Sequence, residues 1–412
     1  MALVGCGGDE PTGDDEVGDT GDTDGDEGED TTTGTEAGTD DSGTTDAGPT
    51  DTDGSTDAGT TEEGTTDEEE SSEEETTGDP EPLDPLPESN VGEWVYHEIP
   101  GTYCRDGSPA GLVVRYADND SKLAIFMEGG GACFNGLTCA ANPSSINPGS
   151  YDPGPFGGVF DDQNPDNPMM DYNFVFIPFC TGDVFMGTTE SGDAQGGPQD
   201  QMFVGHNNLE IMLDRIVDTW PNAQEVVDTG VSAGGFGAGA NYDTVASYFP
   251  DVDVVLLDDS GPLFRDEYLA PCLQQQFRDT WAIDAALPQD CEGCFNGDGG
   301  GLSNYLVYIQ EKYPNAPMGI MSSLEDGVIK LFFGYGANDC NAFFPSFNNF
   351  PEALADMRDN VLTYDNSGTY FMNGTGHTSL SGNGFYSTEV NGVVMSDWVT
   401  DLMDGVPSDV AP

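Results

Sequence analysis

Short apolar runs alternate with helical patterns along the chain from residue 91 onward. In residues 207–220 the apolar side chains recur every three or four positions, the spacing of one helix face. Further helical patterns end at about residue 248 and occupy residues 326–334 and 351–362. Apolar runs of strand length occupy residues 123–127, 173–179, 225–229, 252–257, 318–322 and 369–372. This alternation predicts an α/β fold, with a mainly parallel sheet covered by helices on both faces.

Two parts of the chain depart from this alternation. Residues 262–317 interrupt it and hold three cysteines, so we interpret them as an insertion into a domain spanning residues 91–412. Residues 7–90 form a Thr/Gly-rich acidic stretch without Lys, Arg or aromatic residues. Such a composition cannot bury enough apolar surface to offset its ordering entropy, so it predicts a disordered acidic tail before the domain.

The charge of the chain limits its partners. The sequence has 77 acidic and 9 basic residues, a formal net charge of −68. Charge of this sign repels polyanions, which argues against nucleic acid or an anionic membrane surface as a partner. No apolar stretch approaches the ~18 residues of a membrane-spanning helix, so membrane attachment is expected only through a lipid.

Eight of the nine cysteines lie in the folded part of the chain. An even number of cysteines in one domain suggests an oxidising compartment and up to four disulfides. Cys291 and Cys294 have the spacing of zinc ligands, but no second pair and no nearby histidine completes such a site. We therefore expect no metal.

The ninth cysteine, Cys6, ends a lipobox-like segment, residues 1–6. In a lipobox the cysteine becomes the lipidated first residue of the mature protein. Only five residues precede it, fewer than a signal peptide has, so we interpret the start of the sequence as trimmed or misassigned. This interpretation places the protein at the cell surface or in the periplasm, with a lipid on Cys6 and the acidic tail as a tether. Without the lipid the protein is expected to be secreted.

A candidate nucleophile lies in residues 230–234, which read Gly-Val-Ser-Ala-Gly between a predicted strand and a predicted helix. A sharp turn from strand to helix holds the serine in a strained conformation, and flanking side chains would clash there. Glycines at both flanks relieve that clash. The pattern therefore predicts Ser232 as a nucleophile exposed at a helix N-terminus, in an α/β-hydrolase-like fold.

The base is chosen by chain order. A serine nucleophile needs a base, usually histidine, and the chain has three histidines. In α/β-hydrolases the acid and then the histidine follow the serine, and only His377 follows Ser232. It lies in a glycine-rich loop after a predicted strand. We interpret His97 and His206 as structural.

Four carboxylates are candidates for the acid. Asp326 follows the strand at residues 318–322 and precedes the histidine, as the chain order requires, so it is the predicted acid. Its neighbour Glu325 is an alternative. Asp258 and Asp259, which follow the strand after the serine turn, are the others.

Three successive glycines follow the strand at residues 123–127. Glycines at such a place let backbone N–H groups approach a developing oxyanion, and the N–H of Ala233 would be a second donor. Such a loop could also bind phosphate, but no Lys or Arg is nearby, which disfavours that reading.

Taken together, these motifs resemble the pectin acetylesterase family, which includes Notum-type carboxylesterases. The resemblance rests on FMEGGGACFN at residues 126–135, IPFCTGD at 177–183, GVSAGG at 230–235 and the order of Asp326 and His377. It covers about residues 91–400. It implies an α/β-hydrolase fold and serine carboxylesterase activity through a Ser/Asp/His triad, without a cofactor.

The resemblance also implies individual site residues. It maps the oxyanion donors onto Gly130, Gly131 and Ala233. Plant and animal members usually carry an aromatic residue in the glycine loop near Ala132, and its absence here alters the mouth of the pocket.

Two disulfides are implied by the same resemblance, Cys104–Cys180 and Cys133–Cys139. The pairing of the other four cysteines of the domain stays open.

The expected substrate is an acetyl ester, either on a neutral acetylated polysaccharide such as xylan or on a small molecule, and we expect a monomer. One alternative is a lipase-like esterase of longer acyl groups. It needs a contiguous apolar cavity, which residues 331–333 and 343–344 could line, although we interpret them as core packing. The other alternative is a catalytically inactive, carbohydrate-binding surface lipoprotein.

Overall fold

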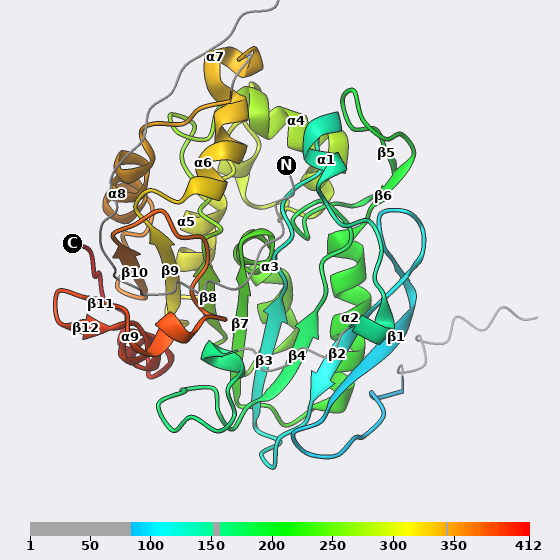
Figure 1. The fold of residues 1–412 in the computed structure, drawn as a ribbon, viewed down its shortest axis with the longest axis vertical. Helices are drawn as coiled ribbons and strands as arrows, with labels where there is room; N and C mark the ends of the chain where they lie inside the picture. The colour runs from blue at the N-terminus through cyan, green and yellow to red at the C-terminus, as the bar shows by residue number, and fades with distance from the viewer. Residues whose placement is uncertain (1–83, 151–156, 343–344) are drawn as a thin grey trace, which may run out of the picture. The chain divides into compact units, whose positions relative to one another are not determined.

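A central eight-stranded sheet organises the computed structural model, which describes residues 84–150, 157–342 and 345–412 (Figure 1). The strand order is β1-β2-β4-β3-β7-β8-β9-β10. These strands are β1 (Trp94–Tyr103), β2 (Pro109–Arg115), β3 (Lys122–Met127), β4 (Asn173–Ile177), β7 (Glu225–Val231), β8 (Val255–Asp259), β9 (Met318–Ser323) and β10 (Ser367–Met372). Two small hairpins join β5 (Thr189–Gly192) to β6 (Gln201–Phe203) and β11 (Glu389–Val390) to β12 (Val393–Val394).

The helices follow the strands along the chain. They are α1 (Gly136–Ala140), α2 (Gly205–Thr219), α3 (Ala233–Tyr248), α4 (Pro271–Trp281), α5 (Asn304–Lys312), α6 (Gly327–Phe333), α7 (Ala337–Cys340), α8 (Phe350–Asn360) and α9 (Met395–Met403). Strands β4, β3, β7, β8, β9 and β10 run parallel to one another, and β1 and β2 add an antiparallel edge. The carboxyl ends of the six parallel strands therefore meet at one edge of the sheet.

Both faces of the sheet are apolar, as β3 illustrates. Leu123, Ile125 and Met127 join a core cluster that includes residues of α2, α3, α5 and α8. Ala124 and Phe126 point to the opposite face, into a cluster that includes residues of α9. Since alternate residues of a strand face opposite sides, a strand apolar throughout is buried on both. The predicted α/β architecture with helices on both faces is confirmed.

The six predicted strands correspond to β3, β4, β7, β8, β9 and β10. The edge strands β1 and β2 were not predicted. β1 shows no clean alternation, because its first four residues are all half-buried and Pro100 and Gly101 accompany a shift in its pairing register with β2. Residues 262–317 connect β8 to β9 and contain α4 and α5, and α5 packs against α3.

The folded part begins before the predicted boundary at residue 90. Leu86 is 3% exposed, and its backbone nitrogen donates to Oγ of Thr219 at the end of α2. Pro85 accepts a hydrogen bond from Arg215 of the same helix. This short segment packs along α2 through one buried leucine and forms no helix or strand. Its composition therefore did not distinguish it from the acidic tail.

Three sequence predictions fall outside the described residues. They are the lipid attachment at Cys6, most of the acidic tail and the packing of residues 343–344. In the described ranges, no helix is both long and apolar enough to cross a bilayer.

Candidate active site

Ser232 occupies the turn between β7 and α3, where the backbone is strained. Its φ of 58° and ψ of −118° lie in a region that non-glycine residues rarely adopt. A side chain on Gly234 would come within 1.9 Å of the carbonyl oxygen of Met127, so only glycine fits there. This is the tight strand-to-helix turn that the Gly-x-Ser-x-Gly pattern predicts.

The glycine loop after β3 lies against this turn. A Cβ on Gly129 would be 3.1 Å from Cβ of Ser232. Ala233 is the first residue of α3, and the first N–H groups of a helix have no partner within it. The glycine loop, at Gly129, and the N–H of Ala233 therefore both lie next to the serine.

His377 follows β10 and contacts the predicted acid. Its Nδ1 lies 2.8 Å from Oδ2 of Asp326, which is fully buried after β9. The other carboxylate oxygen, Oδ1, accepts the N–H groups of Val328 and Ile329 and so caps α6. The same carboxylate thus serves as helix cap and as partner of the histidine. A carboxylate at Nδ1 fixes the orientation of the imidazole and leaves Nε2 as the proton-accepting atom.

The three alternative acids contact other groups. Glu325 pairs with the ammonium of Lys330. Asp258 accepts the N–H of Gly261 at 2.8 Å, and burial raises the pKa of its carboxyl group to about 8.

Asp259 has a different role, because it holds the segment after the histidine. Its Oδ2 accepts the N–H groups of Ser379 at 2.5 Å and Leu380 at 2.9 Å. Its backbone carbonyl accepts the N–H of Ser232 at 2.8 Å. Burial, the largest cause, raises the pKa of this carboxyl group despite these hydrogen bonds.

The other two histidines lie in different surroundings. Nδ1 of His206 on α2 lies 2.7 Å from Oδ1 of Asn241 on α3. His97 is on the edge strand β1, and burial, together with the charge of Arg215, lowers its pKa. Neither histidine takes part in the contacts around Ser232.

These placements share one physical cause. Ser232 follows β7, Asp326 follows β9, His377 follows β10 and the glycine loop follows β3. All four strands are parallel, so their carboxyl ends bring residues far apart in sequence to one edge of the sheet.

Ser232 also lies on the wall of an apolar cavity. The cavity and its open mouth together enclose about 550 Å³ of unfilled space. Its walls come from the glycine loop, α3, α4 and α6, and α4 and α6 lie above the sheet in Figure 1. The lining residues are Gly131, Ala132, Phe134, Val184, Met186, Ser232, Ala233, Phe236, Leu263, Leu269, Phe277, Trp281, Leu302, Ile329, Phe332 and Phe333.

From the sequence, we interpreted residues 331–333 as core packing rather than as the lining of a cavity. Phe333 does belong to the core and Phe332 packs against it, but both also line the cavity, and Leu331 is exposed. Phe277 and Trp281 come from α4, in the predicted insertion. The spacing of Leu273, Phe277 and Trp281 at four-residue intervals was the available signal, but such a stripe equally suits a core helix. Residues 343–344 lie outside the described ranges.

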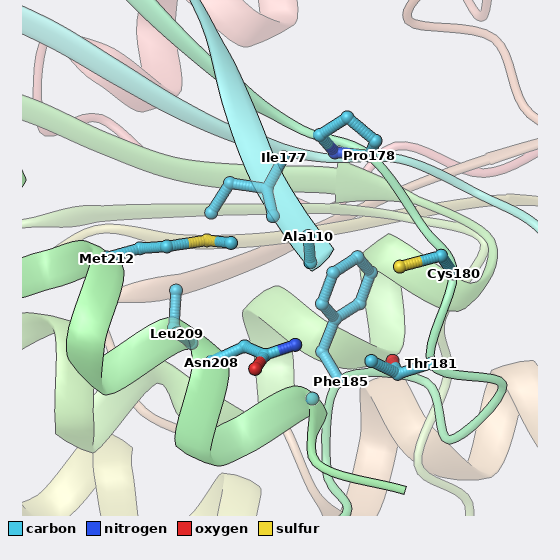
Figure 2. A pocket seen from close by; sticks show the side chains of 10 residues that line it. Ala110, Ile177, Pro178, Cys180, Thr181, Phe185, Asn208, Leu209 and Met212 are labelled. Carbon is cyan, nitrogen blue, oxygen red and sulfur yellow. The ribbon is translucent and has the colours of Figure 1, made fainter. Parts of the chain in front are cut away.

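A smaller cavity of about 270 Å³ lies between α2 and the sheet (Figure 2). Phe185 lines it, whereas its neighbours Val184 and Met186 line the cavity at Ser232. No catalytic side chain lines the smaller cavity, so we assign it no part in the chemistry.

Disulfides join all eight cysteines of the described part. Cys104 pairs with Cys180 and Cys133 with Cys139, the two pairs that the resemblance implies. The remaining pairs, which the sequence left open, are Cys272–Cys340 and Cys291–Cys294. Extensive disulfide formation is typical of proteins exposed to an oxidising compartment.

A structural comparison identifies the class of the fold. The chain is similar to the structure of the Wnt deacylase Notum from Drosophila, with a TM-score of 0.55 and 21% sequence identity. The match covers 74% of this chain and 91% of the other. The chain is therefore an α/β hydrolase in fold, and the serine turn of its sheet occurs in the setting typical of that class.

The model of the Pectinacetylesterase family matches residues 94–326, more than half of the chain. The chain belongs to this family. Palmitoleoyl-protein carboxylesterase NOTUM of Mus musculus is 30% identical over 170 residues, which cover 38% of this chain and 33% of the relative. The chain thus spans about a third of the length of that relative.

One relative is named as inactive. The inactive palmitoleoyl-protein carboxylesterase notum1b of Danio rerio is 32% identical over 99 residues, covering 23% of this chain and 71% of the relative. Family membership therefore does not decide whether a chain is active, and the residues of the site have to carry that argument.

Proposed function

We propose that this protein is a serine carboxylesterase in which Ser232 is the nucleophile, His377 the general base and Asp326 the residue that orients the base. The observation that carries the proposal is the strained backbone of Ser232 on the wall of an apolar cavity. Strain at a nucleophile is kept only where the surrounding structure enforces it, and it holds the hydroxyl toward the substrate. The buried Asp326–His377 contact supports the assignment.

The reaction follows from these groups. Oγ of Ser232 attacks the ester carbonyl carbon while Nε2 of His377 takes its proton. The oxyanion that forms accepts hydrogen bonds from the backbone N–H groups of Gly130, Gly131 and Ala233. The C–O bond to the alcohol then breaks and the alcohol leaves with the proton from His377. A water molecule, activated by the same imidazole, hydrolyses the acyl-serine and regenerates the enzyme.

The cavity favours an apolar acyl group over acetate. Among the described residues, six aromatic rings border it, including Phe277, Trp281 and Phe332, and no charged side chain does. Burying each additional CH₂ of an acyl chain there contributes about 0.8 kcal/mol, a gain that acetate cannot use. The carboxylesterase relatives are named for palmitoleoyl-protein. We therefore infer that the preferred substrates are esters of acyl chains longer than acetyl.

Acetyl esters of a neutral polysaccharide such as xylan remain a second candidate. The family description, Pectinacetylesterase, favours them, and an acetyl group also fits a larger cavity. The two candidates differ in how kcat/KM depends on acyl length.

A catalytically inactive, carbohydrate-binding lipoprotein on the same fold is the competing class. Such a protein has no need of a strained serine, a buried histidine partner and a glycine loop at one sheet edge. Retention of all three favours the enzyme.

Labelling and kinetics test the proposal together. A fluorophosphonate probe should label the purified protein and fail to label Ser232→Ala, because the probe reacts with an activated serine. His377→Ala should lower kcat on nitrophenyl esters by several orders of magnitude, and the double variant should be little worse, since the residues act as one unit. Nitrophenyl esters from acetyl to palmitoyl, with acetate release from acetylated xylan in parallel, rank the substrates. Labelling that persists in Ser232→Ala would show that the nucleophile is wrong.

We also propose that Cys6 carries a lipid and that the acidic segment after it tethers the enzyme to a membrane surface. The support is the lipobox-like sequence and the long, polar, aromatic-free stretch that follows it. Firm anchoring needs more than one acyl chain, which a diacylated and N-acylated cysteine supplies.

A further inference from the structure

Asn142, just beyond α1, contacts the backbone of the glycine loop. Its Nδ2 donates to the carbonyl oxygen of Gly130 at 2.8 Å. The residue is 8% exposed, and a Cβ on Gly131 would be 3.7 Å from the same nitrogen. The amide therefore binds the backbone directly beside the proposed oxyanion donors.

The bond to Gly130 controls where the next N–H points. The carbonyl of Gly130 and the N–H of Gly131 belong to one planar trans peptide, in which they point in opposite directions. Drawing the carbonyl toward Asn142 aims the N–H away from Asn142. Three consecutive glycines can adopt many conformations, so the loop needs an external contact to keep this peptide in one orientation.

Asn142 is itself held in place from several directions. Nη2 of Arg105, a buried residue, donates to the backbone carbonyl of Asn142 at 3.0 Å. The backbone nitrogen of Asn142 donates to the carbonyl of Cys139, which is bonded to Cys133 just after the glycine loop. A side chain supported in this way can transmit a fixed position to the peptide that it binds.

The surroundings of the side-chain oxygen of Asn142 support a role for the hydrogen bond that its nitrogen donates. Within the described residues, Oδ1 of Asn142 is buried and has no hydrogen-bond partner among protein groups. A buried amide with an unpaired oxygen costs stability, and an apolar side chain of similar size would avoid that cost. The bond from Nδ2 to Gly130 is the feature that an apolar side chain could not provide.

We propose that Asn142 is a positioning residue that orients the Gly130–Gly131 peptide so that the N–H of Gly131 faces the developing oxyanion. The inference rests on the proposed function, because it assigns a role within that reaction. Asn142 itself does not touch the reacting atoms and acts through the peptide.

Asn142→Asp is the direct test, since it keeps the shape and replaces the donor with an acceptor facing the carbonyl. We expect kcat to fall by about 10²-fold, the scale of a misplaced catalytic group, with KM within about twofold of wild type. Affinity for a trifluoromethyl ketone, whose serine adduct carries the same oxyanion, should fall by a similar factor. Asn142→Ala should behave likewise, and it replaces Asn142→Asp if that variant does not fold.

Asn366 provides a matched control. It is also 8% exposed, and its Nδ2 donates to the carbonyls of Tyr313 and Ala316. Its Oδ1 likewise has no protein partner in the described ranges. Asn366→Asp should lower Tm and leave kcat and ketone affinity unchanged.

The outcomes separate the two proposals. Unchanged kcat in a folded Asn142 variant, an equal loss in Asn366→Asp, or a rise in KM alone would overturn the positioning role. Failure of the wild type to react with the fluorophosphonate probe would instead overturn the proposed function.

Discussion

The backbone N–H of Ser232 donates to the carbonyl oxygen of Asp259 at 2.8 Å. The carboxylate of Asp259 in turn accepts the N–H groups of Ser379 and Leu380, just beyond His377. One residue at the end of β8 therefore joins the turn of the proposed nucleophile to the loop of the proposed base. The turn at Ser232 and the loop of His377 are not held to each other by helix or sheet hydrogen bonds, so this link helps to fix their relative position.

The first prediction separates this link from the proposed acid. Asp326→Asn should lower kcat by about 10⁴-fold, because an amide at Nδ1 favours the wrong tautomer of His377. Asp259→Asn keeps the tautomer and weakens the hold on the loop, so kcat should fall by only about 10–10²-fold. Nitrophenyl ester kinetics measure both, with Glu325→Gln as the control that should stay near wild type. A larger loss in Asp259→Asn than in Asp326→Asn would contradict the assignment.

A second prediction concerns stability against pH. Burial raises the pKa of Asp258 to about 8, and burial followed by the charge of Asp258 raises the pKa of Asp228. The carboxyl group of Asp258 therefore keeps its proton to a higher pH in the folded protein than in the unfolded chain, where it titrates near pH 4. The stability associated with this proton is fully present below about pH 4 and is lost as the pH rises from there through about 8.

Asp258→Asn removes one of these titrations. We expect the free energy of unfolding at pH 8 to rise by on the order of 5 kcal/mol, with little change at pH 4, because the two pKa values of Asp258 differ by about four units. Urea unfolding at both pH values measures this difference, and Asp120→Asn, at an exposed position, is the control. An equal effect of Asp258→Asn at the two pH values would show that the titration is not the cause.

Chain order alone was enough to propose the pair of Ser232 and His377. Only one histidine follows Ser232, and both residues follow parallel strands whose carboxyl ends meet at one edge of the sheet. Chain order favoured Asp326 as the acid but left Asp259 open, since both lie at the carboxyl ends of parallel strands. Only the direction of each side chain distinguishes the partner of His377 from the residue that holds its loop.

Apolar side chains limited the prediction in another way. Phe332 on α6 and Phe277 on α4 have the sequence signature of core residues, because a helix face buried against a core and one facing a cavity carry the same pattern. A core helix face touches the side chains opposite it, whereas a helix face at a cavity is separated from them by open space. That depends on the packing of residues 262–317 over the sheet, which no local pattern encodes.

The third prediction concerns the disulfide Cys272–Cys340, which links α4 to α7. Helix α4 lines the cavity, and α7 follows α6, which lines it as well. The disulfide closes a loop of 68 residues, and the chain-entropy model predicts that such a bridge stabilises the folded state by about 4 kcal/mol. Cys291–Cys294 closes a loop of only three residues, for which the same model predicts about 2 kcal/mol. Replacing both cysteines of the longer bridge by serine should lower Tm more. It should also raise KM for long-chain esters while sparing acetyl esters. Equal changes for both ester classes would argue against a role of this bridge in the cavity.

The fourth prediction concerns membrane attachment. In cells that express the full-length gene, Cys6→Ser should move the protein from the membrane to the soluble fraction, because no other attachment is expected. Limited proteolysis of the wild type should remove residues up to about 84 and release an active core, since Leu86 is already packed against α2. Retention of Cys6→Ser in the membrane fraction would rule out the lipid at this residue.

The last prediction concerns the acyl group. Leu263 lines the cavity and is 3% exposed, so Leu263→Phe should shorten the space available to an acyl chain. We expect kcat/KM for octanoyl and longer nitrophenyl esters to fall by tenfold or more, because losing burial of two CH₂ groups costs about 1.6 kcal/mol. Acetyl esters should be almost unaffected. Leu306 on α5 is equally buried and does not line the cavity, so Leu306→Phe should lower stability without changing the chain-length profile. If the wild type already prefers acetyl to every longer chain, the cavity does not hold the acyl group, and the acetylated polysaccharide becomes the better candidate.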